Sequence, residues 1–155
     1  MSWEMGPGVV EFPDGVRVRG RGLTREACPD PRPEWGLYLL ASPAEQPCPG
    51  RWVRWRDFWL PGDGNDARLA FTEAYHRAAA GARVEIACGG GKGRTGTALA
   101  CIAQLGGVPA GNATAWVRAH YDPHAVETPW QRRFVRRFLT ADRPSPGLPA
   151  DGGLI

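Results

Sequence analysis

The most distinctive chemistry in this sequence lies in the segment CGGGKGRT, which runs from Cys88 to Thr95. A cysteine becomes a nucleophile at neutral pH when its thiolate is stabilised. A glycine-rich loop before a helix offers that stabilisation, because it presents backbone N–H groups and the positive end of the helix dipole to an anion. The same amides can bind phosphoryl oxygens, and the planar guanidinium of Arg94 can bind two of them. The pattern therefore predicts attack of Cys88 on a phosphate.

Nucleotide binding is the alternative use of such a loop. A P-loop requires G-x-x-x-x-G-K-[ST], but here Lys92 is followed by Gly93. This mismatch argues against a nucleotide loop.

The segment resembles the signature H-C-x5-R-[ST] of the cysteine-dependent protein tyrosine and dual-specificity phosphatases, in an atypical dual-specificity-like form. The resemblance implies that Cys88 forms a phosphocysteine intermediate, that Arg94 binds the phosphate, and that the Thr95 hydroxyl assists the thiolate. It also implies a protein tyrosine phosphatase-like fold. The predicted phosphate-binding residues are Gly89, Gly90, Gly91, Lys92, Gly93 and Arg94.

A phosphoester oxygen leaves readily only when an acid protonates it. In this family the acid is an aspartate on a movable loop upstream of the cysteine, often within WPDFGVP. The segment WRDFWLP is similar and puts Asp57 at that place, 88 − 57 = 31 residues before Cys88. Asp63 is the rival, but its surroundings, PGDGND, are typical of a turn and a helix cap. We therefore expect Asp57 to be the acid.

Downstream of the loop, the segment HYDPHAVETPWQRRFV resembles the family segment RPGAIETPEQEEFV. The glutamine of that segment orients the water that hydrolyses the phosphocysteine, and Gln131 occupies its position. A second interpretation needs no catalysis, because Thr128 as N-cap, Pro129 at the first helical position and Gln131 at N3 form a capping box. Both interpretations are open at the level of sequence.

Three residues depart from the family pattern or extend it. Ala87 stands where the family commonly has a histidine that orders the loop, which predicts a less reactive cysteine. Glu85 interrupts an apolar strand, so it needs a partner such as an arginine, or it faces solvent. Lys92 is the only lysine of the chain. It matches a lysine in the similar loop CKAGKGRTG, and that lysine serves highly charged substrates such as phosphoinositides. The other basic position of that loop is occupied by Gly89 in this chain.

The elements that must position these residues follow from the hydrophobic periodicity. A buried strand, a glycine loop and a helix predict an α/β domain with a central, largely parallel sheet flanked by helices. In such folds ligands bind beyond the carboxyl ends of the strands. Residues Trp130, Phe134, Val135, Phe138 and Leu139 are predicted to form the buried stripe of the last helix. We expect strands at 9–12, 16–20, 35–41, 51–55 and 83–87, and helices at 65–80, 94–105, 110–119 and from 128.

Composition limits the class of protein. A chain of 155 residues with 43% hydrophobic and 23% charged residues is typical of one globular domain. We assign residues 1–140 to a phosphatase-like domain and residues 141–155 to a Pro- and Gly-rich tail. The net charge of +3 is mild and the arginines are dispersed, so no nucleic-acid partner is expected. No segment has the length of a membrane span or a signal peptide, which predicts a cytoplasmic location without membrane insertion.

The four cysteines, Cys28, Cys48, Cys88 and Cys101, form no CxxC pair and have no histidine at metal-ligand spacing. We therefore expect no metal, no cofactor and no disulfide framework. Pairing of Cys28 or Cys48 with Cys88 under oxidation is a further hypothesis.

These residues together predict a phosphatase that hydrolyses phosphomonoesters, with protein phosphotyrosine as the first candidate substrate and dual specificity as its extension. The alternatives are a phosphoinositide or inositol phosphate phosphatase and a phosphate-binding module with little turnover. Sulfur transfer on a rhodanese-like cysteine loop is a third alternative, which would need no acid loop.

Overall fold

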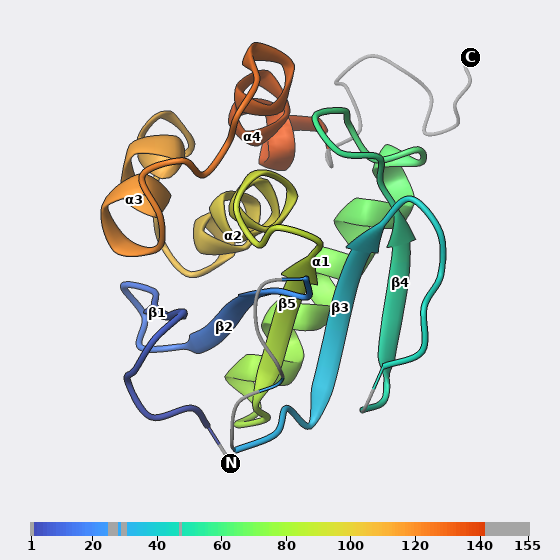
Figure 1. The fold of residues 1–155 in the computed structure, drawn as a ribbon. Helices are drawn as coiled ribbons and strands as arrows, with labels where there is room; N and C mark the ends of the chain where they lie inside the picture. Colours follow the sequence, from blue (N-terminus) through green and yellow to red (C-terminus); the bar gives the residue numbers. More distant parts are fainter. Residues whose placement is uncertain (1, 25–27, 29–30, 47, 142–155) are drawn as a thin grey trace, which may run out of the picture.

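The computed structural model describes residues 2–24, 28, 31–46 and 48–141. Five strands form one sheet in the order β1-β2-β5-β3-β4 (Figure 1). Only β1 and β2 are antiparallel, and the other three pairs are parallel. The predicted α/β fold with a largely parallel sheet is confirmed. The strands are β1 (Val9–Glu11), β2 (Arg17–Gly22), β3 (Trp35–Leu40), β4 (Gly50–Arg54) and β5 (Val84–Cys88).

The helices lie where the periodicity predicts them. They are α1 (Gly64–Ala79), α2 (Gly93–Leu105), α3 (Ala113–His120), preceded by a 3-10 turn at Ala110–Asn112, and α4 (Pro129–Ala141). None of the helices in the described ranges is both long and apolar enough to cross a membrane. The predicted tail, apart from its first residue, lies outside the described residues.

The capping box at the start of α4 is confirmed. Thr128 Oγ1 accepts from Gln131 N at 3.2 Å, and Gln131 Oε1 accepts from Thr128 N at 3.3 Å. The predicted apolar stripe of α4 is wrong at Trp130, which is 43% exposed. The Trp130 indole lies on the ring of Trp59, with ring centroids 6.0 Å apart, instead of packing into the core.

The hydrophobic core lies on the face of the sheet that packs against α1 and α2. Side chains alternate across β5, so Val84, Ile86 and Cys88 point to this face and belong to the core. The helices α3 and α4 pack on α2, and α1 crosses behind the sheet (Figure 1). The carboxyl ends of β5, β3 and β4 meet at one edge, where the loop after Cys88 begins.

The opposite face of the sheet carries a buried charge cluster around Glu85, whose side chain is 0% exposed. Arg21 donates to both carboxylate oxygens at 2.7 and 3.0 Å, and Arg19 lies 3.2 Å from Oε1. Burial raises the pKa of Tyr38 above its ordinary value, so its hydroxyl stays protonated and donates to Oε2 of Glu85 at 3.2 Å. Of the two possibilities that the sequence leaves open for Glu85, an arginine partner or exposure to solvent, the structure shows the arginine partner.

This cluster generates a prediction about stability. Replacement Glu85→Gln leaves two buried guanidinium groups without their counter-charge, so it should lower the free energy of unfolding by about 3–5 kcal/mol. The matched control is Glu11→Gln, which breaks the exposed ion pair with Arg17 and should cost less than about 1 kcal/mol. Urea unfolding of both variants measures the difference. Equal losses of unfolding free energy would show that the buried cluster stabilises the fold no more than the exposed ion pair does.

Candidate active site

The loop after β5 contacts the sulfur of Cys88, a residue that is 1% exposed. The Gly91 amide donates to Cys88 Sγ at 3.1 Å, and α2 begins at Gly93, two residues later. A thiolate at this position receives a hydrogen bond and lies close to a helix N-terminus, both of which stabilise negative charge.

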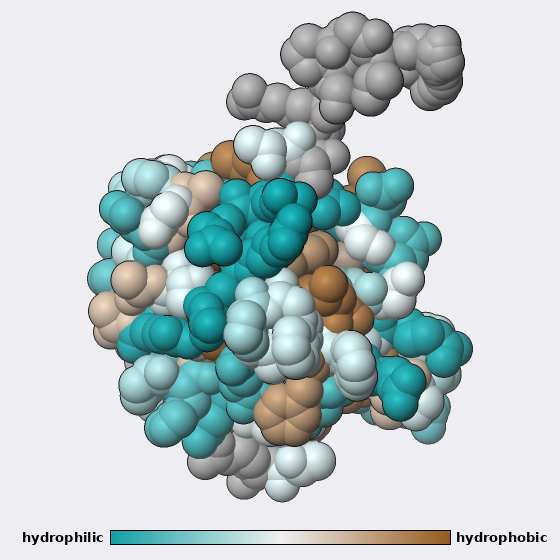
Figure 2. Space-filling view, turned by 90° about the horizontal axis from the view of Figure 1, so that it is seen from above, coloured by the Kyte–Doolittle hydropathy of each residue, from teal (hydrophilic) through white to brown (hydrophobic). Residues whose placement is uncertain are grey.

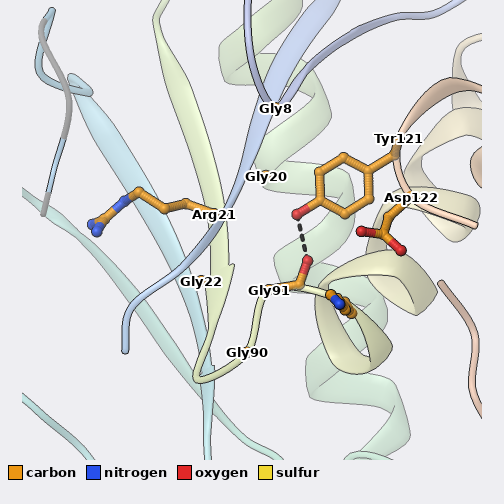
Figure 3. Close-up of a pocket in the computed structure, with 9 residues that line it drawn as sticks. Gly8, Gly20, Arg21, Gly22, Gly90, Gly91, Tyr121 and Asp122 are labelled. Atoms are coloured by element: carbon orange, nitrogen blue, oxygen red, sulfur yellow. Dashed lines mark hydrogen bonds between the residues drawn. The ribbon is translucent and has the colours of Figure 1, made fainter. Parts of the chain in front are cut away.

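Gly91 is the residue that allows the loop to close. Its φ of 75° lies in the left-handed region. A Cβ here would lie 2.5 Å from Gly22 N and 2.7 Å from Gly22 Cα, so β2 and the loop could not approach each other this closely if residue 91 had a side chain. Leu23 N donates to the Cys88 carbonyl at 2.9 Å, and the hydroxyl of Tyr121 donates to the Gly91 carbonyl (Figure 3). The loop is therefore held from two sides.

The guanidinium of Arg94 reaches the neighbouring strands. Its Nη1 donates to the carbonyl of Leu39, at the end of β3, at 3.2 Å and to that of Trp55, just after β4, at 3.1 Å. Its Nε is buried and makes no hydrogen bond with a described residue, although Asp57 Oδ1 lies 3.7 Å away. A buried polar atom without a partner is uncommon in a folded protein and occurs at reactive sites.

Asp57 lies at the rim of this site, with 55% of its side chain exposed. Its Oδ1 accepts from the amide of Phe58, a residue whose φ of 65° is rare for a non-glycine residue. The rival Asp63 has another role: it is the N-cap of α1, where its Oδ1 accepts from Asp66 N at 3.0 Å. The structure therefore brings Asp57, and not Asp63, to Arg94.

Aromatic side chains surround the segment that carries Asp57. Trp55 Nε1 donates to the Trp59 carbonyl at 2.7 Å, and Trp130 Nε1 donates to the Phe58 carbonyl at 2.6 Å. Phe58 and Trp59 are nevertheless more than half exposed, at 53% and 57%. Figure 2 looks down on the face at which the strands end and shows a small apolar area among polar residues.

Thr95 and Gln131 differ in how their polar atoms are used. The Thr95 hydroxyl is fully buried and finds no hydrogen-bond partner in the described part of the chain. Gln131 is also fully buried, but its Oε1 accepts from Glu127 N at 2.9 Å and from Thr128 N, and its Nε2 donates to the Trp59 carbonyl at 3.1 Å. Gln131 thus joins the start of α4 to the Asp57 segment.

Lys92 lines a pocket of about 360 Å³ on the β2 side of the loop. Glycines of β2 and of the loop form much of its wall, and Tyr121 and Asp122 close one side (Figure 3). Arg21 contributes its backbone, because its side chain points away from the pocket toward Glu85. Neither Cys88 nor Arg94 lines this pocket, so it adjoins the candidate reaction site without containing it.

Sequence reasoning missed Glu127, although the residue stands within the segment that resembles the family. Its carboxyl group lies against Gly93: a Cβ on Gly93 would be 2.7 Å from Glu127 Cδ and closer still to Oε1. Burial of the carboxyl, with a smaller contribution from the charge of Asp57, raises the pKa of Glu127 above its ordinary value, while Arg94 and Lys92 oppose the rise. Two carboxylates, not one, therefore border the loop.

The remaining predicted groups lie elsewhere. Cys48 Sγ is 3.1 Å from the Tyr38 hydroxyl, on the face of the sheet opposite to Cys88, so the hypothesis that it pairs with Cys88 does not fit this fold. Cys28 is half-buried, and its pairing with Cys88 under oxidation stays a prediction. Ala87 is fully buried on that face, beside Tyr38 in the register of the sheet. Within the described ranges, no three His, Cys, Asp or Glu side chains gather as a metal site would require.

A family model described as PTP-SAK, the DSP-PTPase phosphatase domain of Swiss Army Knife proteins, matches residues 63–140. The matched range includes the loop from Cys88 to Arg94 together with Glu127 and Gln131, and it begins after Asp57. The match with the family model covers just over half of the chain.

Two curated relatives come from Methanocaldococcus jannaschii, and both are described as uncharacterised proteins. MJECL20 is 48% identical over 59 residues, which are 38% of this chain and 39% of the relative. MJ0215 is 46% identical over 56 residues, which are 36% of this chain and 34% of the relative. The similarity thus spans little more than a third of each relative.

Solved structures share the whole fold. The crystal structure of Tk-PTP in its active form covers 90% of this chain and all of its own, with a TM-score of 0.64 and 22% identity. Kinase associated phosphatase (KAP), crystallised with its catalytic-site cysteine replaced by serine, covers 91% of this chain and all of its own, with a TM-score of 0.64 and 12% identity. At these identities the likeness establishes the fold.

Proposed function

The chain belongs to the family of DSP-PTPase phosphatase domains found in Swiss Army Knife proteins, and from this premise we propose that it hydrolyses phosphomonoesters through a phosphocysteine on Cys88. The observation that carries the proposal is the pairing of Cys88 with Arg94 in one loop. Cys88 Sγ accepts a hydrogen bond from the Gly91 amide, and Arg94 Nε is buried without a hydrogen-bond partner among the described residues. KAP, whose fold is similar, also has a cysteine at its catalytic site.

In the first step the Cys88 thiolate attacks phosphorus. The S–P bond forms, the bond from phosphorus to the leaving oxygen breaks, and the carboxyl group of Asp57 gives its proton to that oxygen. The loop amides from Gly89 to Gly93 and the guanidinium of Arg94 hold the three other oxygens, and the charge of Arg94 stabilises the transition state. The buried hydroxyl of Thr95 is the group proposed to assist the thiolate.

In the second step water attacks the phosphocysteine. The bond from the water oxygen to phosphorus forms, the S–P bond breaks, and the Asp57 carboxylate takes the proton that the water loses. The thiolate of Cys88 and the acid form of Asp57 are then restored, so the cycle needs neither metal nor cofactor.

The substrate we favour is a phosphorylated protein, with phosphotyrosine before phosphoserine or phosphothreonine. The support is the exposed aromatic surface of Phe58 and Trp59 beside Asp57, which suits an aryl leaving group. A phosphoinositide is the second candidate, because Lys92 lines a pocket next to the loop. We propose that this hydrolysis of phosphorylated proteins takes place in the cytoplasm.

The nucleophile is tested with the variant Cys88→Ser and an aryl phosphate such as 4-nitrophenyl phosphate. A serine hydroxyl is not ionised at neutral pH, so turnover should fall on the order of 10⁴-fold or more. Phosphate release measures turnover, and binding of inorganic phosphate shows whether the loop is intact. Turnover equal to that of the unchanged protein would remove Cys88 from the mechanism, and phosphate binding without turnover in the unchanged protein would identify a binding module.

The acid is tested with the variant Asp57→Asn. A general acid must be protonated to act, so the limb of the pH profile on which kcat falls as pH rises should depend on Asp57. Asparagine cannot ionise; kcat should therefore fall by about 100-fold and its alkaline limb should disappear. The matched control is Asp63→Asn, which keeps an effective N-cap on α1 and should leave the pH profile unchanged. An alkaline limb that survives in Asp57→Asn would assign the proton to another group.

A further inference from the structure

Hydrolysis of a phosphocysteine, which the proposed function requires, needs a group that orients the attacking water. Gln131 is poorly placed for this, because its side chain is fully buried and already engaged. Both of its oxygen lone pairs are used by the amides of Glu127 and Thr128, and its nitrogen donates to the Trp59 carbonyl. Gln131 would have to break the capping box to accept a hydrogen bond from a water.

The carboxyl group of Glu127 lies at the start of α2, next to the loop. It occupies the space that a side chain on Gly93 would fill, at the first turn of α2 and next to Arg94. The charges of Asp57, Arg94 and Lys92 act on this carboxyl, so it belongs to the same electrostatic cluster as the candidate reaction site. No described residue donates a hydrogen bond to it.

The backbone around Glu127 is held in an unusual conformation. Val126 has a φ of 62°, which is a marked outlier for a β-branched residue. Arg118 donates to the carbonyl of Ala125 at 2.8 Å and to that of Val126 at 2.7 Å, and Gln131 Oε1 accepts the Glu127 amide. Such strain persists only where the surroundings enforce it, and it is concentrated at functional sites.

A second glycine of α2 makes the approach of this segment possible. Gly96 stands one helical turn after Gly93, and a Cβ on it would lie 2.8 Å from Ala125 Cα. The two glycines therefore form a shallow groove along α2 in which residues 125–127 lie. The groove, and not the length of the Glu127 side chain alone, brings the carboxyl group to the loop.

We propose that Glu127 orients the water that hydrolyses the phosphocysteine, and that Gln131 acts as the clamp that positions Glu127. One hydrogen of the water is held by a carboxylate oxygen of Glu127. The other proton passes to Asp57 as the bond from oxygen to phosphorus forms and the S–P bond breaks. Glu127 changes neither its bonds nor its protonation state in this step.

The test separates the two chemical steps with 4-nitrophenyl phosphate in rapid-quench experiments. Glu127→Ala should release one nitrophenol per protein in a fast burst at the rate of the unchanged protein. Steady-state turnover should then fall by about 10- to 100-fold, because the water of the second step has lost the carboxylate that accepts its hydrogen bond. Glu127→Gln keeps an acceptor oxygen of the same reach, so it should recover most of the turnover. A merely structural role would slow both steps and would not show this rescue.

Gly93→Ala is a second variant that leaves Glu127 chemically intact. The new Cβ displaces the flexible end of the Glu127 side chain, so this variant should also lose turnover. The control is Glu73→Gln on α1, a carboxylate that pairs with Arg77 away from the loop, and it should change neither step.

Two results would overturn the assignment. One is a burst that slows in Glu127→Ala as much as turnover does, and the other is turnover that stays unchanged in this variant. Failure of the proposed function looks different: the unchanged protein would then release no nitrophenol that depends on Cys88, with or without Glu127.

Discussion

The guanidinium of Arg94 holds separate parts of the chain at one point. Its Nη1 binds the carbonyl groups of Leu39 and Trp55, at the ends of two parallel strands, and its Nε faces Asp57 Oδ1 at 3.7 Å. A buried charge is costly unless polar groups surround it, so these contacts cannot separate without a large loss of stability. This one side chain therefore ties the start of α2 to the ends of β3 and β4 and to Asp57.

The two carboxylates of the site share a structural feature. Phe58 and Val126 are the non-glycine residues with positive φ in the described ranges, and each is the neighbour in sequence of Asp57 or Glu127. Both strained segments are held by side chains of adjoining helices: Trp130 binds the Phe58 carbonyl, and Arg118 binds the Val126 carbonyl. The folded core thus supplies the energy that keeps two acidic groups beside one phosphate loop.

What could be predicted from the sequence depended on near neighbours in the chain. The C-x5-R loop, the capping box at Thr128 and the helical periodicity are local patterns. For the glutamate in a buried strand, the sequence predicted either a partner such as an arginine or exposure to solvent, and the structure provides the arginine. The misses depend on distant contacts. Trp130 leaves the core because its indole reaches Phe58, 72 residues away. The position of Glu127 beside the loop could not be predicted, because the φ of Val126 and the groove along α2 follow from tertiary packing.

The central claim is that phosphate passes through Cys88, and the most direct measurement is mass spectrometry of the protein after acid quench during turnover of an aryl phosphate. The account predicts that the peptide containing Cys88 gains the mass of one phosphoryl group, bound through sulfur, and that this mass disappears when substrate is exhausted. Continued release of phosphate from the substrate without any phosphorylated Cys88 peptide, or with the phosphoryl group on another residue, would contradict it.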